Sequence, residues 1–264
     1  MLASARYASK IIKASALIGD TRTLLTQWNL GSSVPENLAR LHAENLLGKS
    51  SRSRLENVLP VFRQRYMADP AVLAGLVVLA HAGLPAPVLD TILLHLTLAS
   101  DALLADCITD LLAPAYARGM RAITPLQVQN WVRAQVDAGK TERPWGPATV
   151  ERVAQGLLAT LRDFGVLHGK IHKYIAPPLV PVESFAFIAL LRYRAGVVGE
   201  RLLHDAAWGQ LMLNELAVER SFVASHQEQL VEFYAAGRAV RISFPSVSPE
   251  EYAHALAQRA YSTA

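Results

Sequence analysis

The chain has 264 residues, of which 52% are hydrophobic and 18% are charged, and its formal net charge is +4. This length and apolar content suffice for one large or several small packed cores, which excludes an intrinsically disordered chain. The single cysteine, Cys107, excludes an intramolecular disulfide and a thiolate metal cluster, and it fits a reducing cytoplasmic location.

Residues 1–120 are predicted to form an all-helical unit. Apolar residues recur there at helical spacing, and glycine, serine and proline separate the runs. Pro60 lies inside one of these helices, and because proline lacks a backbone N–H donor, we expect a kink or a break there. The expected helices cover about residues 8–28, 35–47, 53–67, 70–82, 86–98 and 100–117.

A membrane segment is considered for residues 70–89, which contain no Asp, Glu, Lys or Arg over about the length that spans a bilayer. Gly83, Pro85 and Pro87 end a helix near residue 82, which leaves roughly 13 residues. That length is typical of a buried helix in a soluble core, so no contact with a membrane is expected. Basic residues spread through the first 20 or so positions likewise argue against a secretory signal.

The stretch ENLLGKSSRSRL, residues 44–55, places two arginines among serines at a predicted helix start. Ser53 and Glu56 have the spacing of a capping box, in which each side chain satisfies a backbone N–H of the other residue. The cap does not explain Arg52 and Arg54, because a cation near free N–H groups is unfavourable unless an anion is bound. We therefore predict that this helix presents arginines to phosphates, with plain surface charge as the alternative.

Residues 121–180 show a different pattern. A Thr-Pro pair opens a first helix, a polar turn follows, and a second helix spans about residues 148–164. Strand-forming residues on both sides of His168-Gly169 then predict a basic two-stranded hairpin. This is the order of a winged helix-turn-helix, in which the second helix enters the major groove and the hairpin reaches the DNA backbone or the minor groove.

The second helix of this unit and the segments next to it carry the candidate DNA contacts. Its buried stripe is expected to comprise Val150, Val153, Ala154, Leu157, Leu158 and Leu161. Arg152 and Gln155 have side chains that read base edges, and Thr149 is placed to donate to a phosphate. The candidates in this unit are Arg143, Thr149, Arg152, Gln155, Lys170, His172 and Lys173. A hairpin that only caps the fold and carries ordinary surface lysines is the alternative.

The last third, residues 181–264, is predicted to repeat this layout without sequence similarity. Helical stretches are expected over about 182–195, 199–206 and 214–228. Two strand-like runs on both sides of Ala235-Ala236-Gly237 predict a second hairpin, and therefore a possible second winged helix. Arg238 and Arg241 lie on this hairpin, but the region is net acidic, so packing or partner contact is expected here before contact with DNA.

Positive charge is unevenly distributed along the chain. Lys and Arg exceed Asp and Glu by six in residues 1–67 and by three in residues 143–178, whereas the two other stretches are net acidic. Segregated positive charge favours an anionic partner such as nucleic acid, with a solvated basic face as the simpler alternative.

No catalytic motif is found in the sequence. It contains no phosphate-binding glycine loop, no nucleophile elbow and no metal-ligand cluster, so no enzymatic activity, cofactor or metal is expected. His168 and His172 are four residues apart, but on a hairpin that spacing does not stack the two rings, and no third ligand is close in sequence.

Two stretches resemble elements of one known family. Residues 44–66, ENLLGKSSRSRLENVLPVFRQRY, look like the opening element of the BrxA family of BREX phage-defence proteins. Residues 208–245, WGQLMLNELAVERSFVASHQEQLVEFYAAGRAVRISFP, resemble its C-terminal signature. The helix and hairpin at 146–179 lie where that family has an element ending in Pro-Pro-Leu, and the resemblance extends over about residues 7–257.

The resemblance implies a small, mostly helical cytoplasmic protein with winged-helix character that binds double-stranded DNA and has no enzymatic activity. It also implies partners that are encoded with it, namely a methyltransferase, a large ATPase and a phosphatase-like protein, which together mark host DNA and block phage. By position, it implies DNA contacts at Arg52, Arg54, Arg63 and Arg65 in the first element and at Lys170 and Lys173 in the hairpin.

Three functions are therefore weighed, ahead of an enzyme as the fourth. The first is a non-enzymatic component of a defence complex that contacts the phosphates of duplex DNA regardless of sequence. The second is a helical scaffold that docks a partner enzyme, and the third is an RNA-binding factor built on the helical half. Duplex binding that weakens steeply with salt favours the first function, function that survives loss of the candidate cations favours the second, and a preference for single strands or hairpins favours the third.

Overall fold

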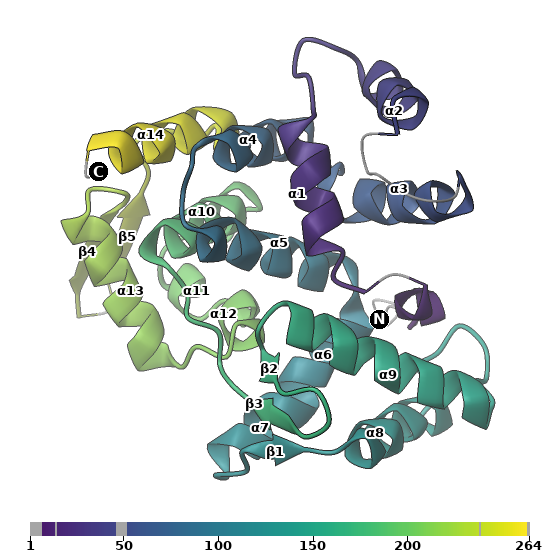
Figure 1. Cartoon of the computed structure of the whole chain (residues 1–264). Coiled ribbons are helices and arrows are strands. Elements are labelled where there is room, and N and C mark those ends of the chain that lie inside the picture. The colour runs from purple at the N-terminus through teal and green to yellow at the C-terminus, as the bar shows by residue number, and fades with distance from the viewer. Residues whose placement is uncertain (1–6, 14, 46–51, 238, 263–264) are drawn as a thin grey trace.

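The computed structural model describes residues 7–13, 15–45, 52–237 and 239–262, and the side chains of residues 52–57 and 260–262 are outside this description. The first part of the chain is helical: the 3₁₀-helix η1 Ser9–Ile12, α1 Ile18–Thr26, α2 Val34–Ala43, α3 Arg52–Tyr66, α4 Pro70–His81, α5 Ala86–Ser100, α6 Ala102–Asp106, the π-helix η2 Cys107–Leu112 and α7 Ala113–Ala117 (Figure 1).

Two small antiparallel sheets lie among the remaining helices. The elements are β1 Ala122–Ile123, α8 Pro125–Asp137, α9 Pro147–Asp163, β2 Leu167–His168, β3 Lys173–Ile175, α10 Val182–Arg194, α11 Glu200–Leu203, α12 Ala206–Gln210, α13 Glu215–Gln227, β4 Glu232–Ala236, β5 Ala239–Ser243 and α14 Pro249–Ser262. The prediction of a mainly α fold with short hairpins is confirmed.

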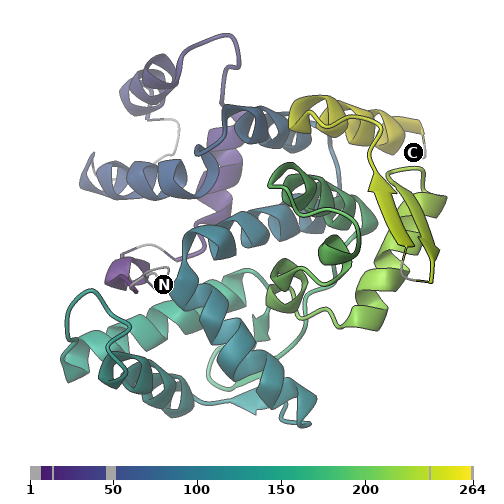
Figure 2. The same ribbon diagram turned by 180° about the vertical axis from the view of Figure 1, so that it is seen from behind.

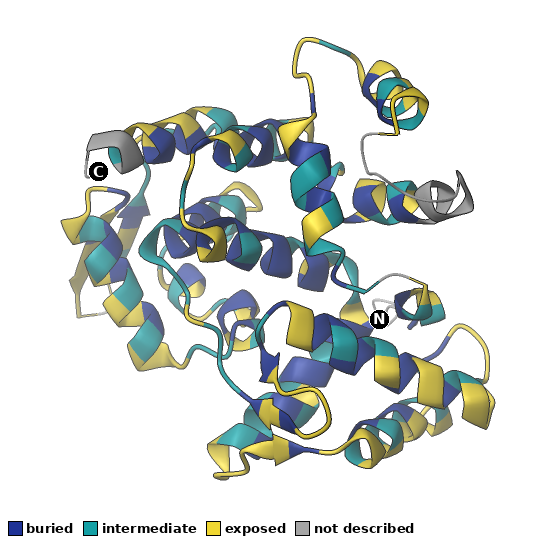
Figure 3. Ribbon diagram, viewed as in Figure 1, coloured by how far each residue is buried: buried dark blue, intermediate teal, exposed yellow. Residues whose placement is uncertain are grey.

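Helices α5 and α10 lie at the centre of the fold, where α5 contacts α3, α4 and α10 (Figure 2). Every residue of α10 from Ser184 to Leu190 is buried, and Figure 3 shows buried residues along most of α5. The Phe185 ring stacks on Trp208 with centroids 4.5 Å apart and meets Phe222 edge-on at 4.8 Å. Aromatic pairs of this kind bury large apolar areas, so this cluster contributes strongly to stability.

The uncharged helix α4 is buried beneath α14, a helix that sequence reasoning did not predict. The two helices lie side by side along the top of Figure 1. Their close approach depends on Gly75, where a Cβ atom would lie 2.8 Å from the carbonyl oxygen of Pro249. Helix α4 ends at His81 and buries Leu76 and Leu79, so the prediction of a core helix over 70–82 is confirmed.

The helices in the described part of the chain can be compared with the length and apolar character of a membrane-spanning helix. There, no single helix combines the length and the apolar character that a bilayer crossing needs. The pair Ala86–Ser100 and Ala102–Ala117 meets the requirement on length and composition when taken together, but it is bent by 108° at its break.

Two predicted helices are each divided in the structure. The stretch 8–28 contains η1 and α1, because Leu17 adopts a left-handed φ of 54° at the N-cap of α1. That conformation is unfavourable for a side chain with a Cβ atom and does not occur inside a helix. The stretch 199–206 ends at α11, and Asp205 begins α12 by accepting a hydrogen bond from a backbone N–H of its first turn.

Helix α3 continues through Pro60, where a kink or break was predicted, and no break is present. Proline removes one backbone hydrogen bond, but Val58 and Phe62 on both sides of it are buried and anchor the helix in the core. The helix begins at Arg52, one residue before the predicted cap at Ser53. The capping box itself lies outside the described side chains and stays a prediction.

Contacts cross the predicted unit boundaries. The backbone N–H of Tyr7 donates to the carbonyl of Lys140 at 2.7 Å, and its carbonyl accepts from Glu142 at 3.1 Å. Gly156 lets η1 approach α9, since a Cβ atom there would lie 2.9 Å from the carbonyl oxygen of Ile11. The N-terminal segment therefore lies against α9, and the division into three units stays a prediction.

The buried histidine of α5 makes stability dependent on pH. The pKa of His95 is lowered to about 4, mainly by burial and secondly by the nearby Arg192 guanidinium, while the Asp205 carboxylate opposes both effects. The folded pKa is below the unfolded value of about 6.5, so the contribution to stability is complete above that pH and is lost as pH falls through about 4. The loss is on the order of 3 kcal/mol.

Urea unfolding of the wild type and of His95→Leu at pH 7 and pH 4 checks this prediction. The wild type is expected to lose more free energy of unfolding between the two pH values than the variant, in which nothing titrates at position 95. Equal losses in the two proteins would contradict a neutral, buried His95.

Candidate nucleic-acid interface

Helix α9 separates its residues into a buried stripe and a polar outer face. Pro147 starts the helix at a position where its missing N–H has no intrahelical role. All six residues predicted for the inner stripe are buried: Val150, Val153, Ala154, Leu157, Leu158 and Leu161. Helix α8, which begins with a capping box of Thr124 and Gln127, packs against this stripe. The predicted helix, turn and helix are therefore present.

The outer face of α9 carries three of the predicted contact residues. Arg152 and Gln155 are exposed, and Thr149 is half-buried near the start of the helix. The Gln155 amide donates to the Glu151 carboxylate at 3.2 Å, which holds this acidic group one turn away along the same face. Arg143 is exposed in the turn before α9. The outer face of α9 therefore offers hydrogen-bond donors from Arg152 and Gln155 to a ligand, whereas the Glu151 carboxylate would repel an anionic ligand.

The hairpin after α9 forms a three-stranded antiparallel sheet with a strand that was not predicted. The strand order is β1-β3-β2, so β3 is central and β1 comes from the segment before α8. Leu167 and Ile175 pair across β2 and β3 and are buried, whereas His168 pairs with Tyr174 and both are exposed. Figure 1 shows this sheet at the C-terminal end of α9.

The turn of this hairpin carries two exposed polar side chains and one buried lysine whose ammonium is hydrogen-bonded. Lys170 and His172 are exposed. Lys173 is only 8% exposed, and its ammonium donates to the carbonyls of Gly169 and Lys170, both at 2.6 Å. Two of its three donors therefore close the turn. Lys173, predicted to contact DNA, lies where it shapes the hairpin.

Removal of this ammonium is expected to destabilise the hairpin. Lys173→Met keeps the buried aliphatic stem but deletes two charge-assisted hydrogen bonds, which should lower the free energy of unfolding by about 2 kcal/mol. Urea unfolding measures the change. Lys170→Met, which removes an exposed lysine three residues away, is the control and should change stability by less than about 0.5 kcal/mol. Equal effects of the two substitutions would contradict the structural role of Lys173.

The basic residues of α3 differ in how far they are exposed to solvent. Arg63 is exposed on α3, whereas Arg65 is buried and donates to the carbonyls of Ser15 and Ala16 at 3.0 and 3.2 Å. Arg65 therefore fastens the segment before α1 onto α3. The side chains of Arg52 and Arg54 are outside the described residues. Figures 1 and 2 place α3 and α9 on the same side of the molecule, and η1 contacts both.

One cation beside the sheet was missed in the sequence. Arg121 precedes β1, and its carbonyl accepts a hydrogen bond from Ile175 at 2.7 Å, which places it next to β3. Its exposed guanidinium lies 4.1 Å from the Tyr116 ring centroid. Only the pairing of β1 with β3 brings Arg121 to this sheet, so no local pattern could have placed it there.

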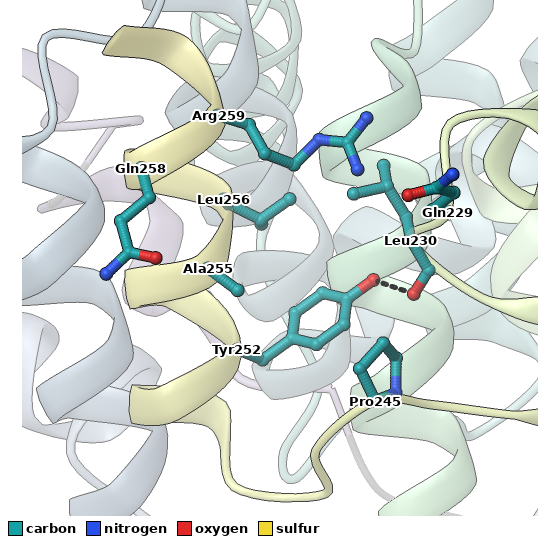
Figure 4. A pocket seen from close by; sticks show the side chains of 8 residues that line it. All are labelled: Gln229, Leu230, Pro245, Tyr252, Ala255, Leu256, Gln258 and Arg259. Atoms are coloured by element: carbon teal, nitrogen blue, oxygen red, sulfur yellow. Dashed lines mark hydrogen bonds between the residues drawn. The ribbon is translucent and has the colours of Figure 1, made fainter. Parts of the chain in front are cut away.

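Other candidate sites offer little chemistry among the described residues. No group of three or more His, Cys, Asp or Glu there could hold a metal ion. Burial raises the pKa of Cys107 to about 12, so the thiol stays protonated and unreactive. A pocket of about 390 Å³ beside α14 contains Tyr252, whose hydroxyl already donates to the Leu230 carbonyl at 2.7 Å (Figure 4). Arg259 in the same pocket pairs with Glu228 at 3.0 Å.

Comparisons with known proteins agree with this architecture. A crystal structure of an uncharacterized protein from Magnetospirillum magneticum is similar with a TM-score of 0.58 and 12% identity, covering 76% of this chain and 98% of that one. The crystal structure of SspB is similar with a TM-score of 0.62 and 10% identity, covering 98% of this chain and 90% of that one. These identities are too low to show more than a shared fold.

A search of curated proteins finds no match for this chain. The model of the BrxA family, in contrast, matches residues 5–190, which is more than half of the chain. The match includes α3, the exposed face of α9 and the hairpin that follows it. The chain therefore belongs to the BrxA family, whose members are components of BREX phage-defence systems.

Proposed function

We propose that this BREX component is a non-enzymatic protein that binds double-stranded DNA through a winged helix-turn-helix formed by β1, α8, α9, β2 and β3. The observation that carries the proposal is the outer face of α9, which presents Arg152 and Gln155 and is followed by a hairpin with Lys170 and His172 exposed at its turn. In a winged helix-turn-helix, the second helix enters the major groove and the hairpin lies on the backbone or in the minor groove.

The charge of this region supports an anionic ligand. Residues 118–178 contain nine Lys and Arg residues against four Asp and Glu residues. Helix α9, with 17 residues, is about 25 Å long. Arg143 precedes it and Lys170 follows it, so cations at its two ends are available to the phosphates on either side of a groove.

The roles of the candidate residues follow from their exposure. Arg152 and Gln155 are proposed to reach base edges, and the residues proposed to contact phosphates are Arg63, Arg143, Thr149, Lys170 and His172. Arg65 and Lys173 are proposed to position the segments that carry these contacts, because their donors are bound to backbone carbonyls. Arg52 and Arg54 stay predicted phosphate contacts.

Contact with other BREX components, such as the methyltransferase, the ATPase or the phosphatase-like protein, is compatible with this role. The exposed hairpin of β4 and β5 presents Tyr234 and Arg241, with the guanidinium 5.6 Å from the ring centroid. Tyrosine and arginine are enriched at the centres of protein interfaces. A scaffold function therefore has its own candidate surface, at a distance along the chain from α9.

Fluorescence anisotropy with a labelled duplex tests the proposal. We expect binding at 50 mM salt, a loss of affinity of at least about tenfold between 50 and 200 mM salt, and weaker binding to single-stranded DNA and to RNA hairpins. No duplex binding at 50 mM salt contradicts the proposal, and tighter binding to RNA hairpins identifies an RNA-binding factor instead. Phage defence that survives the joint substitution of Lys170, Lys173, Arg52 and Arg54 would identify a scaffold.

A further inference from the structure

The apex of the β2–β3 hairpin has a feature that the packing of the fold does not explain. Ile171 is 83% exposed, the largest value for a bulky hydrophobic side chain in the described part of the chain. It stands between Lys170 and His172, which are also exposed. A single exposed apolar residue is common on protein surfaces. Exposure alone therefore does not indicate a function for Ile171, and the structure of the turn that carries it has to be considered.

That turn is held in one shape without any contribution from Ile171. The Lys173 ammonium binds the carbonyls of Gly169 and Lys170 from below. Gly169 has a φ of 92°, and a Cβ atom at this position would lie 2.0 Å from the carbonyl oxygen of His172. Only glycine fits there, so the turn is closed tightly on itself. Ile171 thus projects from a support whose conformation is fixed before any ligand binds.

Charge at the apex favours a specific environment for this side chain. Lys170 and His172 lie directly on both sides of Ile171 in the sequence, and the bound ammonium of Lys173 lies at the base of the turn. An apolar tip next to two lysines and a polar histidine matches the minor groove of DNA, where narrow A·T-rich stretches have an enhanced negative potential. Isoleucine is among the side chains that proteins insert between base steps from this groove.

We propose that Ile171 is a wedge that enters the minor groove, partly unstacks one base step and kinks the duplex. This inference rests on the proposed DNA-binding function and specifies its substrate, a duplex that contains an easily deformed step. Pyrimidine–purine steps such as TA unstack most readily, so they are the preferred position of the wedge. The rigid turn lowers the entropy lost on insertion, because the hairpin does not have to be ordered by the DNA.

The experiment measures bending and binding separately. A duplex with one central TA step and a donor and an acceptor dye at its ends reports its bend by energy transfer, and the anisotropy of one dye reports affinity. We expect the wild type to bend the duplex by at least about 20°. Ile171→Ser should abolish the bend while weakening binding less than tenfold, because the phosphate contacts remain. Ile171→Leu should preserve the bend.

Leu179→Ser is the matched control, since Leu179 is 82% exposed and lies outside the hairpin. It should change neither the bend nor the affinity. A wild-type protein that binds the duplex without bending it, or an Ile171→Ser variant that bends it fully, overturns the wedge and leaves the proposed function intact. A wild-type protein that does not bind the duplex overturns the proposed function, and the wedge with it.

Discussion

Replacement of Phe185 by alanine is expected to lower the free energy of unfolding by about 3–5 kcal/mol. Phe185 is fully buried on α10, stacks on Trp208 and meets Phe222 edge-on. Truncation of its ring removes apolar area from the core and leaves a cavity that the surrounding helices cannot close. Because α10 contacts α5, α13 and α14, this cavity lies where the N-terminal and C-terminal parts of the fold meet.

Urea unfolding curves of the wild type and the variant measure this loss. Phe185→Leu retains most of the side-chain volume and should be clearly less destabilising than Phe185→Ala. Val223→Ala, on the exposed side of α13, should change stability by less than about 0.5 kcal/mol. A loss below 1 kcal/mol on Phe185→Ala would contradict the central position of this ring.

Reversal of two charges on the proposed interface should have the largest effect on function. The double variant R152E/K170E places acidic groups on the outer face of α9 and at the hairpin turn, and it changes the net charge from +4 to 0. Two attractive contacts become repulsive, so we expect duplex affinity at 50 mM salt to fall on the order of a hundredfold, or about 2.7 kcal/mol. Anisotropy titrations measure the change.

The matched control is R201E/R220E, which gives the whole protein the same net charge of 0 but places the substitutions on α11 and α13. Arg201 and Arg220 are both exposed and lie in the net acidic last third of the chain. A global effect of charge would weaken binding in both double variants to the same degree. We expect the control to retain affinity within about threefold, because Arg201 and Arg220 lie on α11 and α13 and not on the elements of the proposed interface. Equal losses would place the interface elsewhere.

The sequence predicted elements with strong periodicity and missed those without it. Helix α9 was predicted from about residue 148 because its apolar residues recur at helical spacing, and in the structure it begins one residue earlier, at Pro147. Strand β1 has only two residues, and it exists because β3 pairs with it, which no local pattern reveals. Helix α14 was missed although Pro249 and two glutamates mark its start; the backbone of Pro249 lies close to Gly75 of α4.

The chemical type of the candidate site residues was readable, but their orientation was not. Arg152 on a helix with a defined buried stripe could be assigned to the outer face by counting residues. Lys173 and Arg65 are cations whose partners are backbone carbonyls, 3–4 and 49–50 residues away in the chain. The partners of Arg65 are brought to it by the tertiary fold and those of Lys173 by the shape of the hairpin turn, so residue type alone did not reveal either set of hydrogen bonds.

The salt dependence of duplex binding tests the central claim most directly. Each phosphate contact contributes about 0.9 to the slope of the logarithm of the binding constant against the logarithm of salt concentration. The variant R143A/K170A removes two proposed phosphate contacts, one before α9 and one after it. Its slope should be shallower than that of the wild type by about 1.8. A slope equal to that of the wild type would contradict an interface formed by α9 and its hairpin.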